Sequence, residues 1–538
     1  MMAGVGALLL VAALTQRAAV PARTPDEQLA EQIRLREEAG ELRLAQRATV
    51  LGFYARRAFR PAWNKEHGPN RLADDLVATL NRADLEGLTP EDYHVNAIGS
   101  LLAYVRLATS SGRAPELARL ADLDLLLTDA FLLYGSHLLG GRVDPESLHP
   151  LWEASPRGAD LATLLEQALD SRKIARALQR LAPTHEGYRR LRDALARERA
   201  YAESGAWPVL PRGPALKRGD SSAAVALLRE RLHAEGDLDK KDGDRFDDAL
   251  HEAVRRFQWR HGLEQSGVVD AETFAELNVT ADARVNQIKL SLERWRWLPQ
   301  DLGRRRVEVN IAAYELQVID DDEVALRMRV VVGRAYRRTP VFSDTIRYIV
   351  LNPNWHVPKS IAVEELIPKI QKDSTYLERF GMRLQTAGPN AQDVDPRTVD
   401  WKEITAENFP YRLRQEPGRL NALGRMKFMF PNQYDVYLHD TPSRHLFEET
   451  QRDFSHGCIR VEKPIDLAVY LMKKSKWEQE TIERALDEGT ERSIYLPRPM
   501  PIHLLYFTAW ADEDGTIQFR PDINGVDPPL SRALAKRH

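Results

Sequence analysis

The sequence that decides the fold is Asp435-Val-Tyr-Leu-His-Asp-Thr-Pro442, together with Ser455-His-Gly-Cys-Ile-Arg-Val461 a short way downstream. The first stretch alternates apolar and polar residues, which is the pattern of a strand with one covered face. Cys458 lies 19 residues after His439, enough chain to return on an adjacent strand. The spacing therefore predicts that the thiol and the imidazole meet on one sheet.

Alternation also decides which side chains share a face with these two groups. Asp435, Tyr437 and His439 are expected on one face of the first strand, away from the apolar residues between them. Cys458 lies in a bend next to a glycine, and Arg460 is expected on the same face as the thiol. The two stretches together predict a cluster of polar side chains around the cysteine.

The chain has a single cysteine, so it forms no intramolecular disulfide and has no Cys-x-x-Cys pair for a zinc or redox site. Cys458 is then either a small buried residue or a working thiol. A thiol with a pKa near ~8.5 is mostly protonated at neutral pH, and an imidazole that accepts its proton raises the reactive fraction. His439 is the candidate base. Gly457 permits a bend in which its N–H and that of Cys458 face a developing oxyanion.

Upstream of these motifs, the apolar period changes from that of helices to that of strands after Trp297. Val307, Val309 and Ile311 alternate with polar residues, and the alternation recurs over 316–318 and 326–332. These residues predict hairpin strands of an antiparallel sheet. A helical piece and a long stretch with Pro and Gly interrupt the sheet over about 359–425, an insertion typical of a lid or a binding loop.

The N-terminal half has a different pattern. Residues from about 28 to 204 show the spacing of amphipathic helices, and we assign no chemistry to them. A linker with three prolines over 205–219 separates them from two helical patterns that extend to Asn278. Residues 3–14 form an apolar run of 12, the length of a signal-peptide core and too short to span a bilayer. The run predicts export; an uncleaved anchor or a buried helix is the alternative.

Length and charge narrow the class of protein. A chain of 538 residues is expected to hold several folded units. Its 76 Lys and Arg residues against 79 Asp and Glu residues give a net charge of −3, which offers no long-range attraction to nucleic acid. The fold class that these patterns predict is multidomain α+β.

The segment between the linker and Asn278 contains Leu216-Lys-Arg-Gly-Asp220, Ala253-Val-Arg-Arg-Phe-Gln258 and Gly267 with Asp270. With these residues it resembles the peptidoglycan-binding domain of many wall enzymes. The chain departs from the usual motif at Phe246, which is followed by two aspartates. The resemblance implies a small three-helix domain, and it leaves glycan binding open.

The C-terminal half resembles the L,D-transpeptidases, whose active site is a histidine followed at this interval by Ser-His-Gly-Cys. Arg460 stands where the family usually has Asn, as in the large murein L,D-transpeptidases with a helical lobe. Similarity to that subgroup extends to Asn352-Pro-Asn-Trp-His-Val-Pro358, Lys427-Phe-Met-Phe-Pro431 and the segment 503–510. The resemblance therefore extends over nearly the whole chain.

With that resemblance, we expect the following layout. Residues 1–22 are a signal peptide, 25–206 a helical scaffold lobe and 214–278 a peptidoglycan-binding-like domain. Residues 305–511 are a mainly antiparallel β catalytic domain with a helical lid inserted at about 359–425, and 512–538 are a C-terminal tail.

The resemblance also implies the roles of individual residues. Cys458 is the nucleophile, His439 the base and later the acid, and the backbone carbonyl of Asp440 holds the imidazole ring, with Gly457 in the catalytic bend. The residues expected to contact substrate are Tyr437, Arg460, His456, Ser455 and Trp355. Three of these have structural alternatives: His456 as a turn residue, and Tyr437 and Trp355 as packing residues. No metal or organic cofactor is implied.

The implied reaction is attack of Cys458 on a tetrapeptide stem between its diamino acid and the terminal D-Ala. The thioester then passes to the side-chain amine of a diaminopimelate, which gives a 3→3 cross-link in peptidoglycan. Water as acceptor makes the protein an L,D-carboxypeptidase, and a lipoprotein lysine makes it an anchoring enzyme. A wall-binding scaffold with an incidental thiol is the alternative of a different class. We expect an exported, periplasmic monomer with peptidoglycan stem peptides as partners and no nucleic acid; other wall-synthesis proteins stay open as partners.

Overall fold

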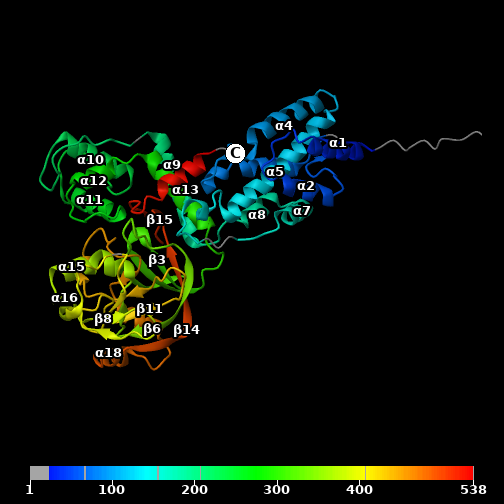
Figure 1. Cartoon of the computed structure of the whole chain (residues 1–538). Coiled ribbons are helices and arrows are strands. Elements are labelled where there is room, and N and C mark those ends of the chain that lie inside the picture. Colours follow the sequence, from blue (N-terminus) through cyan, green and yellow to red (C-terminus); the bar gives the residue numbers. More distant parts are fainter. Residues whose placement is uncertain (1–23, 66–67, 154–156, 206, 406, 537–538) are drawn as a thin grey trace, which may run out of the picture. The chain divides into compact units, whose positions relative to one another are not determined.

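The computed structural model describes residues 24–65, 68–153, 157–205, 207–405 and 407–536, which form two compact units (Figure 1). The first unit comprises the chain up to Asn81 with Pro90–Tyr134 and Asp160–Ala177, and the second comprises the remainder. The predicted signal peptide at 1–22 lies outside the described residues. No helix in the described part of the chain is both long and apolar enough to cross a membrane.

The first unit is helical, as the apolar spacing predicts. The leucine-dense run within α5 is buried, with Leu123, Leu125, Leu127 and Phe131 inaccessible to solvent. The unit contains α1 (Pro25–Ala39), α2 (Arg47–Arg56), α3 (Arg71–Leu80), η2 (Pro90–Tyr93), α4 (Val95–Ser110), most of α5 (Leu117–Gly140), α7 (Leu161–Ser171), most of α8 (Ile174–Gln179), and the short pair β1 (Asn64–Lys65) and β2 (Gly68–Pro69).

A buried carboxylate ties the segment after α2 to α5. Asp124 accepts hydrogen bonds from the Tyr54 hydroxyl (2.6 Å) and from the backbone N–H groups of Ala62 (2.8 Å), Trp63 (3.1 Å) and Asn64 (2.9 Å). The Asn64 side-chain amide donates to it as well, at 2.7 Å. One side chain thus satisfies donors that would otherwise be buried without partners.

Replacing Asp124 by alanine is expected to destabilise this unit by about 3–5 kcal/mol, because several buried donors lose their acceptor at once. Thermal unfolding of the full chain, followed by far-UV circular dichroism, measures the change. Asp75 in α3 is exposed, so Asp75→Ala is the matched control and is expected to change stability by less than about 0.5 kcal/mol. Equal unfolding curves for the two variants would contradict the assignment of Asp124 as a structural centre.

The centre of the second unit is a closed β-barrel. Its strand order is β11-β12-β13-β5-β4-β3-β14-β6, and four of these strands are labelled in Figure 1. Its buried core is built from alternating residues such as Val307, Val309 and Ile349. The strands are β3 (Arg305–Asn310), β4 (Glu315–Asp320), β5 (Glu323–Val331), β6 (Ser343–Leu351), β11 (Met426–Met429), β12 (Leu438–His439), β13 (Ile459–Val461) and β14 (Arg492–Leu505), and α17 (Pro464–Leu471) and α18 (Gln479–Asp487) follow β13.

The prediction of antiparallel hairpins is confirmed for β3 with β4 and for β4 with β5. Asp321 and Asp322 form the turn between β4 and β5, with positive φ angles of 51° and 68°. Two other pairs are parallel, β12 with β13 and β14 with β3. Parallel neighbours need a crossover connection, and the segment from 440 to 458 provides it for β12 and β13.

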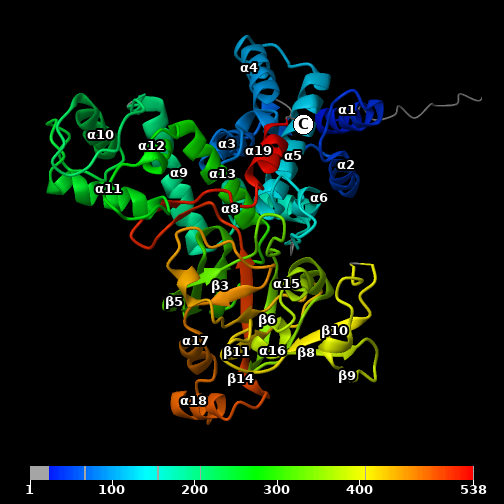
Figure 2. The ribbon, with the colours of Figure 1, turned by 60° about the vertical axis from the view of Figure 1, so that its left-hand side comes forward.

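The insertion is more than a helical lid. Between β6 and β11 the chain forms a four-stranded sheet in the order β7-β10-β8-β9, with its own buried core that includes Ile367, Ile370, Leu384 and Leu413. Figure 2 shows β8, β9 and β10 side by side. Its elements are β7 (Trp355–His356), α14 (Lys359–Ile361), the π-helical turn η4 (Ala362–Leu366), α15 (Ile367–Lys372), α16 (Tyr376–Arg379), β8 (Met382–Thr386), β9 (Asp393–Val394), η5 (Pro396–Thr398) and β10 (Tyr411–Gln415).

The segment that resembles a peptidoglycan-binding domain folds into three helices, α10 (Ala223–Ala234), α11 (Asp248–Arg260) and α12 (Ala271–Leu277). Phe246, Leu250 and Phe257 lie in its core. The departure from the family motif after Phe246 has a structural use, because the Asp247 carboxylate caps α11 by accepting the N–H of Leu250 at 2.8 Å.

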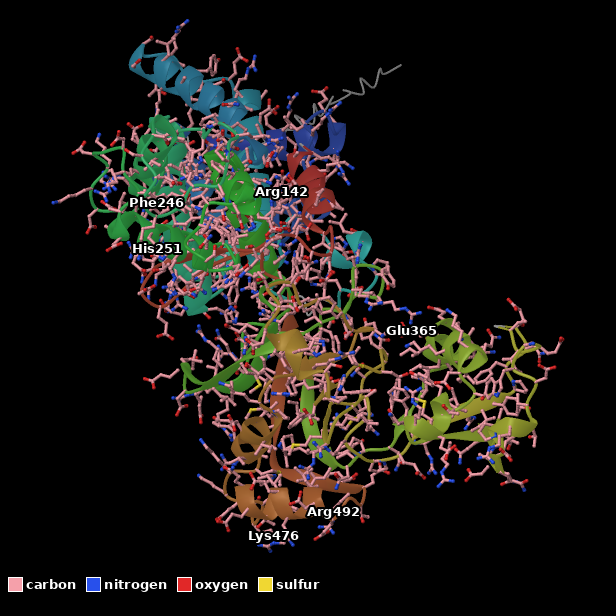
Figure 3. All side chains as sticks on the ribbon, turned by 90° about the vertical axis from the view of Figure 1, so that its left-hand side faces the viewer. Arg142, Phe246, His251, Glu365, Lys476 and Arg492 are labelled. Atoms are coloured by element: carbon pink, nitrogen blue, oxygen red, sulfur yellow. The ribbon has the colours of Figure 1, made fainter. Side chains whose placement is uncertain are left out.

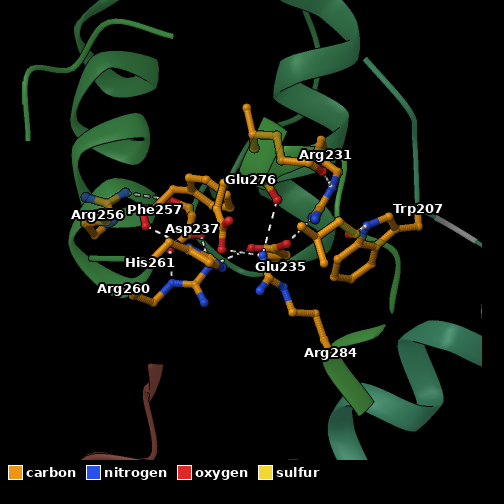
Figure 4. Close-up of polar contacts among 12 residues, drawn as sticks. Trp207, Arg231, Glu235, Asp237, Arg256, Phe257, Arg260, His261, Glu276 and Arg284 are labelled. Atoms are coloured by element: carbon orange, nitrogen blue, oxygen red, sulfur yellow. Dashed lines mark hydrogen bonds and ion pairs between the residues drawn. The ribbon is translucent and has the colours of Figure 1, made fainter. Parts of the chain in front are cut away.

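A buried ion network stabilises the same domain (Figure 4). Arg260 pairs with Asp237 and with Glu235, the latter at 2.7 Å, and Arg231 pairs with Glu235. The Arg231 guanidinium also stacks over Trp207, with 3.5 Å between the guanidinium carbon and the ring centroid. Each of these buried charges therefore lies next to a charge of opposite sign.

Two regions differ from the expected domain limits. Helix α9 (Glu186–Ser204), expected within the scaffold lobe, belongs to the second unit and packs on α13 (Ala281–Arg296). The segment set apart as a C-terminal tail contains β16 (Ile517–Phe519), which pairs with β15 (Ala509–Ala511), and α19 (Asp527–Ala535). Arg294 of α13 forms an ion pair with Asp527 at 2.5 Å, so this segment is part of the fold.

Candidate active site

The parallel pair β12 and β13 brings the predicted residues onto one face. His439 pairs with Arg460, and the N–H of Ile459 donates to the carbonyl of Tyr437 at 3.1 Å. This register sets Cys458 opposite Tyr437. Because alternate residues share a face, Tyr437, His439, Cys458 and Arg460 all face the same side of the barrel wall.

The strand that carries His439 is shorter than the sequence predicts. It comprises only Leu438–His439, and Asp435 has a φ of +53°, in the left-handed region. The chain turns at Asp435, and its backbone carbonyl faces the thiol: the Cys458 Sγ lies 3.7 Å from the Asp435 carbonyl oxygen.

His439 is buried, and its ring contacts the backbone at Asp440 and at Leu423. Its Nδ1 lies 2.5 Å from the carbonyl oxygen of Asp440, so Nδ1 carries the proton and Nε2 is the basic nitrogen. Burial, and next the positive charge of Arg460, lower the pKa of His439 to about 3. The imidazole is therefore neutral at physiological pH.

The Asp440 carbonyl is itself held in place. The backbone N–H of Asp440 donates to the Met426 carbonyl, and the Asp440 carboxylate accepts the N–H of Arg425, both at 2.9 Å. Gly424 has a φ of +63°, and a Cβ there would overlap the Asp440 carboxylate. The loop before β11 thus positions the residue that orients the imidazole.

The thiol of Cys458 is partly exposed and contacts Tyr437. Burial raises its pKa, and hydrogen bonds from the Tyr437 backbone N–H and hydroxyl, together with the charge of Lys427, act to lower it. The Tyr437 ring also lies edge-on to His439, with 5.8 Å between ring centroids. Tyr437 therefore contacts both the thiol and the imidazole.

The bend that carries Cys458 is organised by two hydroxyl groups. Ser455 Oγ donates to the Cys458 carbonyl and accepts the N–H of Gly457 at 3.2 Å, and Thr339 Oγ1 donates to the Gly457 carbonyl at 2.8 Å. Gly457 has a φ of +113°, which L-residues with side chains rarely adopt. The expectation that the Gly457 N–H faces an oxyanion is wrong for this conformation, because Ser455 already occupies that donor. Both hydrogen bonds of the Ser455 hydroxyl are thus to backbone groups of the bend.

Replacing Ser455 by alanine is expected to lower the turnover of the proposed reaction about 10- to 100-fold, because the buried Gly457 N–H and Cys458 carbonyl lose their partner and the bend loosens. Steady-state kinetics with a stem-peptide substrate measures the loss. Ser455→Thr keeps the hydroxyl and is the matched control. Equal activity of the alanine variant and the wild type would show that the bend holds without Ser455.

Two cations flank the thiol. Arg460 was anticipated, and its Nε is buried without a hydrogen-bond partner among the described residues. Lys427 was not singled out as a site residue; it pairs with His439 across β11 and β12, and its Nζ lies 3.8 Å from the centroid of the Tyr437 ring. The sequence feature that points to Lys427 is its position as the one charged residue in the apolar run Met426–Phe430.

The two remaining predicted residues, His456 and Trp355, contact or belong to the insertion. His456 Nε2 contacts the Glu365 carboxylate of η4, a residue labelled in Figure 3. Trp355 pairs with Gln415 in the inserted sheet and packs against the core of the insertion. His456 therefore links the cysteine bend to the insertion, and Trp355 stabilises the insertion itself.

Comparison with known families agrees with this architecture. Residues 304–482 match the model of the L,D-transpeptidase catalytic domain. Residues 48–195 match a model described as "Scaffold domain", and residues 221–277 match one described as "Putative peptidoglycan binding domain".

Individual relatives point to the same family. A protein of Haemophilus influenzae described as "Putative L,D-transpeptidase" is 36% identical over 261 residues, which are 48% of this chain and 51% of that protein. The chain thus matches about half the length of that relative. Solved structures with some similarity include the L,D-transpeptidases of Xylanimonas cellulosilytica (17% identical, 55% of this chain and 98% of that chain, TM-score 0.17) and Stackebrandtia nassauensis (12% identical, 57% and 99%, TM-score 0.22). Three stretches of the chain are therefore similar to a scaffold domain, to a putative peptidoglycan-binding domain and to the L,D-transpeptidase catalytic domain.

Proposed function

We propose that this protein is an L,D-transpeptidase that forms 3→3 peptidoglycan cross-links through a thioester on Cys458. The observation that supports the proposal most directly is the set of side chains on one face of β12 and β13: a partly exposed thiol, a neutral imidazole whose Nδ1 is engaged, and a guanidinium with a buried unpaired nitrogen. A nucleophile, a base and a cation in one place are what acyl transfer from a carboxylate-bearing peptide requires.

In the first half-reaction, Cys458 Sγ attacks the carbonyl carbon between the diamino acid and the terminal D-Ala of a tetrapeptide stem. Nε2 of His439 accepts the thiol proton and passes it to the leaving nitrogen, so that the C–N bond breaks and D-Ala departs as an amine. The low pKa of the imidazole makes the protonated ring a strong acid toward that nitrogen. The product is a thioester and a neutral His439.

In the second half-reaction, the side-chain amine of a diaminopimelate on another stem attacks the thioester. His439 accepts a proton from the amine and returns it to sulfur, which restores the thiol and leaves an amide cross-link. The oxyanion of each tetrahedral intermediate is stabilised by the Cys458 N–H and the Tyr437 hydroxyl, and Arg460 pairs with a stem carboxylate.

The other parts of the chain support the same proposal. The three-helix domain would hold the wall polymer, and the insertion, linked to the cysteine bend through His456 and Glu365, would exclude water and favour the amine over hydrolysis. Since the thiol supplies the covalent chemistry, the proposed reaction requires no metal or organic cofactor. A peptidoglycan substrate places the protein outside the cytoplasm, in the periplasm.

Incubation of the purified chain with disaccharide-tetrapeptides, followed by mass spectrometry of the products, tests the proposal. Dimers that have lost one D-Ala and carry a diaminopimelate-to-diaminopimelate amide are the expected result. Tripeptides without dimers would show a carboxypeptidase, and transfer only to an added lysine peptide would show an anchoring enzyme. No change in the substrate would refute a catalytic role.

A further inference from the structure

We propose that the ammonium group of Lys427 supplies the positive charge that stabilises the Cys458 thiolate, acting across the ring of Tyr437. The inference rests on the proposed function only for the role of Cys458 as nucleophile. Lys427 then stabilises the thiolate, whereas His439 transfers protons during the reaction.

The barrel wall places Lys427 next to the reacting groups. Lys427 pairs with His439, and His439 pairs with Arg460, so the three residues form one row across β11, β12 and β13. The Nζ of Lys427 lies 3.8 Å from the centroid of the Tyr437 ring, and, beyond the effect of burial, the Tyr437 hydroxyl is close enough to the Cys458 sulfur for the thiol to raise the pKa of Tyr437. One aromatic ring thus separates the ammonium from the thiol.

Lys427 has no carboxylate partner that would neutralise it. Among the described residues it forms no ion pair, although it is half-buried. The charged groups that act on it are Cys458, Glu491 and Asp435, in that order. Glu491 accepts hydrogen bonds from Asn354, both at 2.9 Å. A half-buried, unpaired ammonium is costly, and a thiolate nearby offsets that cost.

The other groups around the thiol are less suited to this role. His439 is neutral because its pKa is about 3, so the resting site holds no imidazolium. Arg460 is positive, but it faces Arg334 and Glu365 as well as Cys458. The Asp435 carboxylate acts against ionisation of the thiol. When the thiol ionises, the proton leaves to solvent and the electron pair stays on Sγ, where the ammonium of Lys427 stabilises it.

The single cysteine of the chain makes the test direct, because iodoacetamide alkylation then reports on one thiol. The alkylation rate, measured from about pH 5 to 10, gives the midpoint of thiol ionisation without any turnover. In Lys427→Met the midpoint is expected to rise by about one pH unit, so that alkylation near pH 7 slows about tenfold while the plateau at high pH is unchanged. Lys427→Arg keeps the charge and is expected to restore the wild-type midpoint.

Lys473 provides a matched control, since its Nζ lies 4.0 Å from the Tyr470 ring centroid in the same type of contact. Lys473→Met is expected to leave the midpoint unchanged, and so is His439→Gln. Thiolate absorbance at 240 nm and far-UV circular dichroism accompany each measurement, and Lys427→Gln replaces the methionine variant if that variant misfolds. An unshifted midpoint in the Lys427 variants, or a rise in His439→Gln instead, would overturn the proposal. Either outcome leaves the transpeptidase assay to decide the proposed function independently.

Discussion

Cys458→Ala is expected to abolish the acyl-enzyme and to lower transpeptidation by about 10⁴-fold or more, because no other described side chain on this face is a nucleophile of comparable strength. Intact-protein mass spectrometry after brief exposure to a tetrapeptide substrate is expected to show an adduct on the wild type and none on the variant. The products are quantified as muropeptides in the same reactions.

The same substitution is expected to cost little stability. Cys458 is partly exposed, and the contacts that shape its bend are made by backbone groups of the bend with Ser455 and Thr339. The alanine variant is therefore expected to unfold within about 1 kcal/mol of the wild type. Cross-linking that survives in a folded Cys458→Ala protein would make the thiol incidental and the chain a wall-binding scaffold.

His439→Gln is expected to lower kcat/KM for the transfer about 10²- to 10⁴-fold, the usual contribution of a positioned acid and base. Glutamine keeps a donor toward the Asp440 carbonyl and has no basic nitrogen. Alkylation of Cys458 by iodoacetamide is expected to continue at the wild-type rate, because the thiol remains in place. Loss of alkylation together with loss of transfer would instead indicate that His439 determines the protonation state of the Cys458 thiol.

The same variant has a signature in the pH dependence of stability. The pKa of His439 falls from 6.5 to about 3 on folding, chiefly through burial, so the unfolded chain binds a proton that the folded chain does not. This stabilising contribution is present above about pH 6.5 and is lost progressively as the pH falls toward 3. Denaturant unfolding of wild type and His439→Gln between these pH values measures it. The difference between the two proteins is expected to shrink on acidification, and a constant difference would contradict the burial of a neutral imidazole.

Much of the local structure was predictable from short-range patterns. The alternation at Val307 and Val309 predicts the first barrel strand, and the alternation over 316–318 and 326–332 predicts the hairpin of β4 and β5. Both patterns are local, because each depends on residues that are neighbours in the chain. The shared face of Cys458 and Arg460 was predictable for the same reason.

Other features required contacts between distant segments. The inserted sheet escaped prediction because β7 and β9 have two residues each, too few for a periodicity to show. The Ser455 hydroxyl accepts the N–H of Gly457, so this N–H is not a free donor. The sequence does not show this hydrogen bond. The buried Asp124 centre joins residues about 60 to 70 positions apart, and no local pattern marks it.

By itself, the sequence determined which side chains share a face, Tyr437 with His439 and Cys458 with Arg460, because the side-chain direction in a strand follows from position along the chain. Only the tertiary structure decided that β12 and β13 run parallel, that Tyr437 bridges thiol and imidazole, and that Lys427 lies beneath that ring. The physical reason is that strand pairing and burial are properties of segments brought together from afar. The charge state of His439, and with it the chemistry of the thiol, follows from that burial.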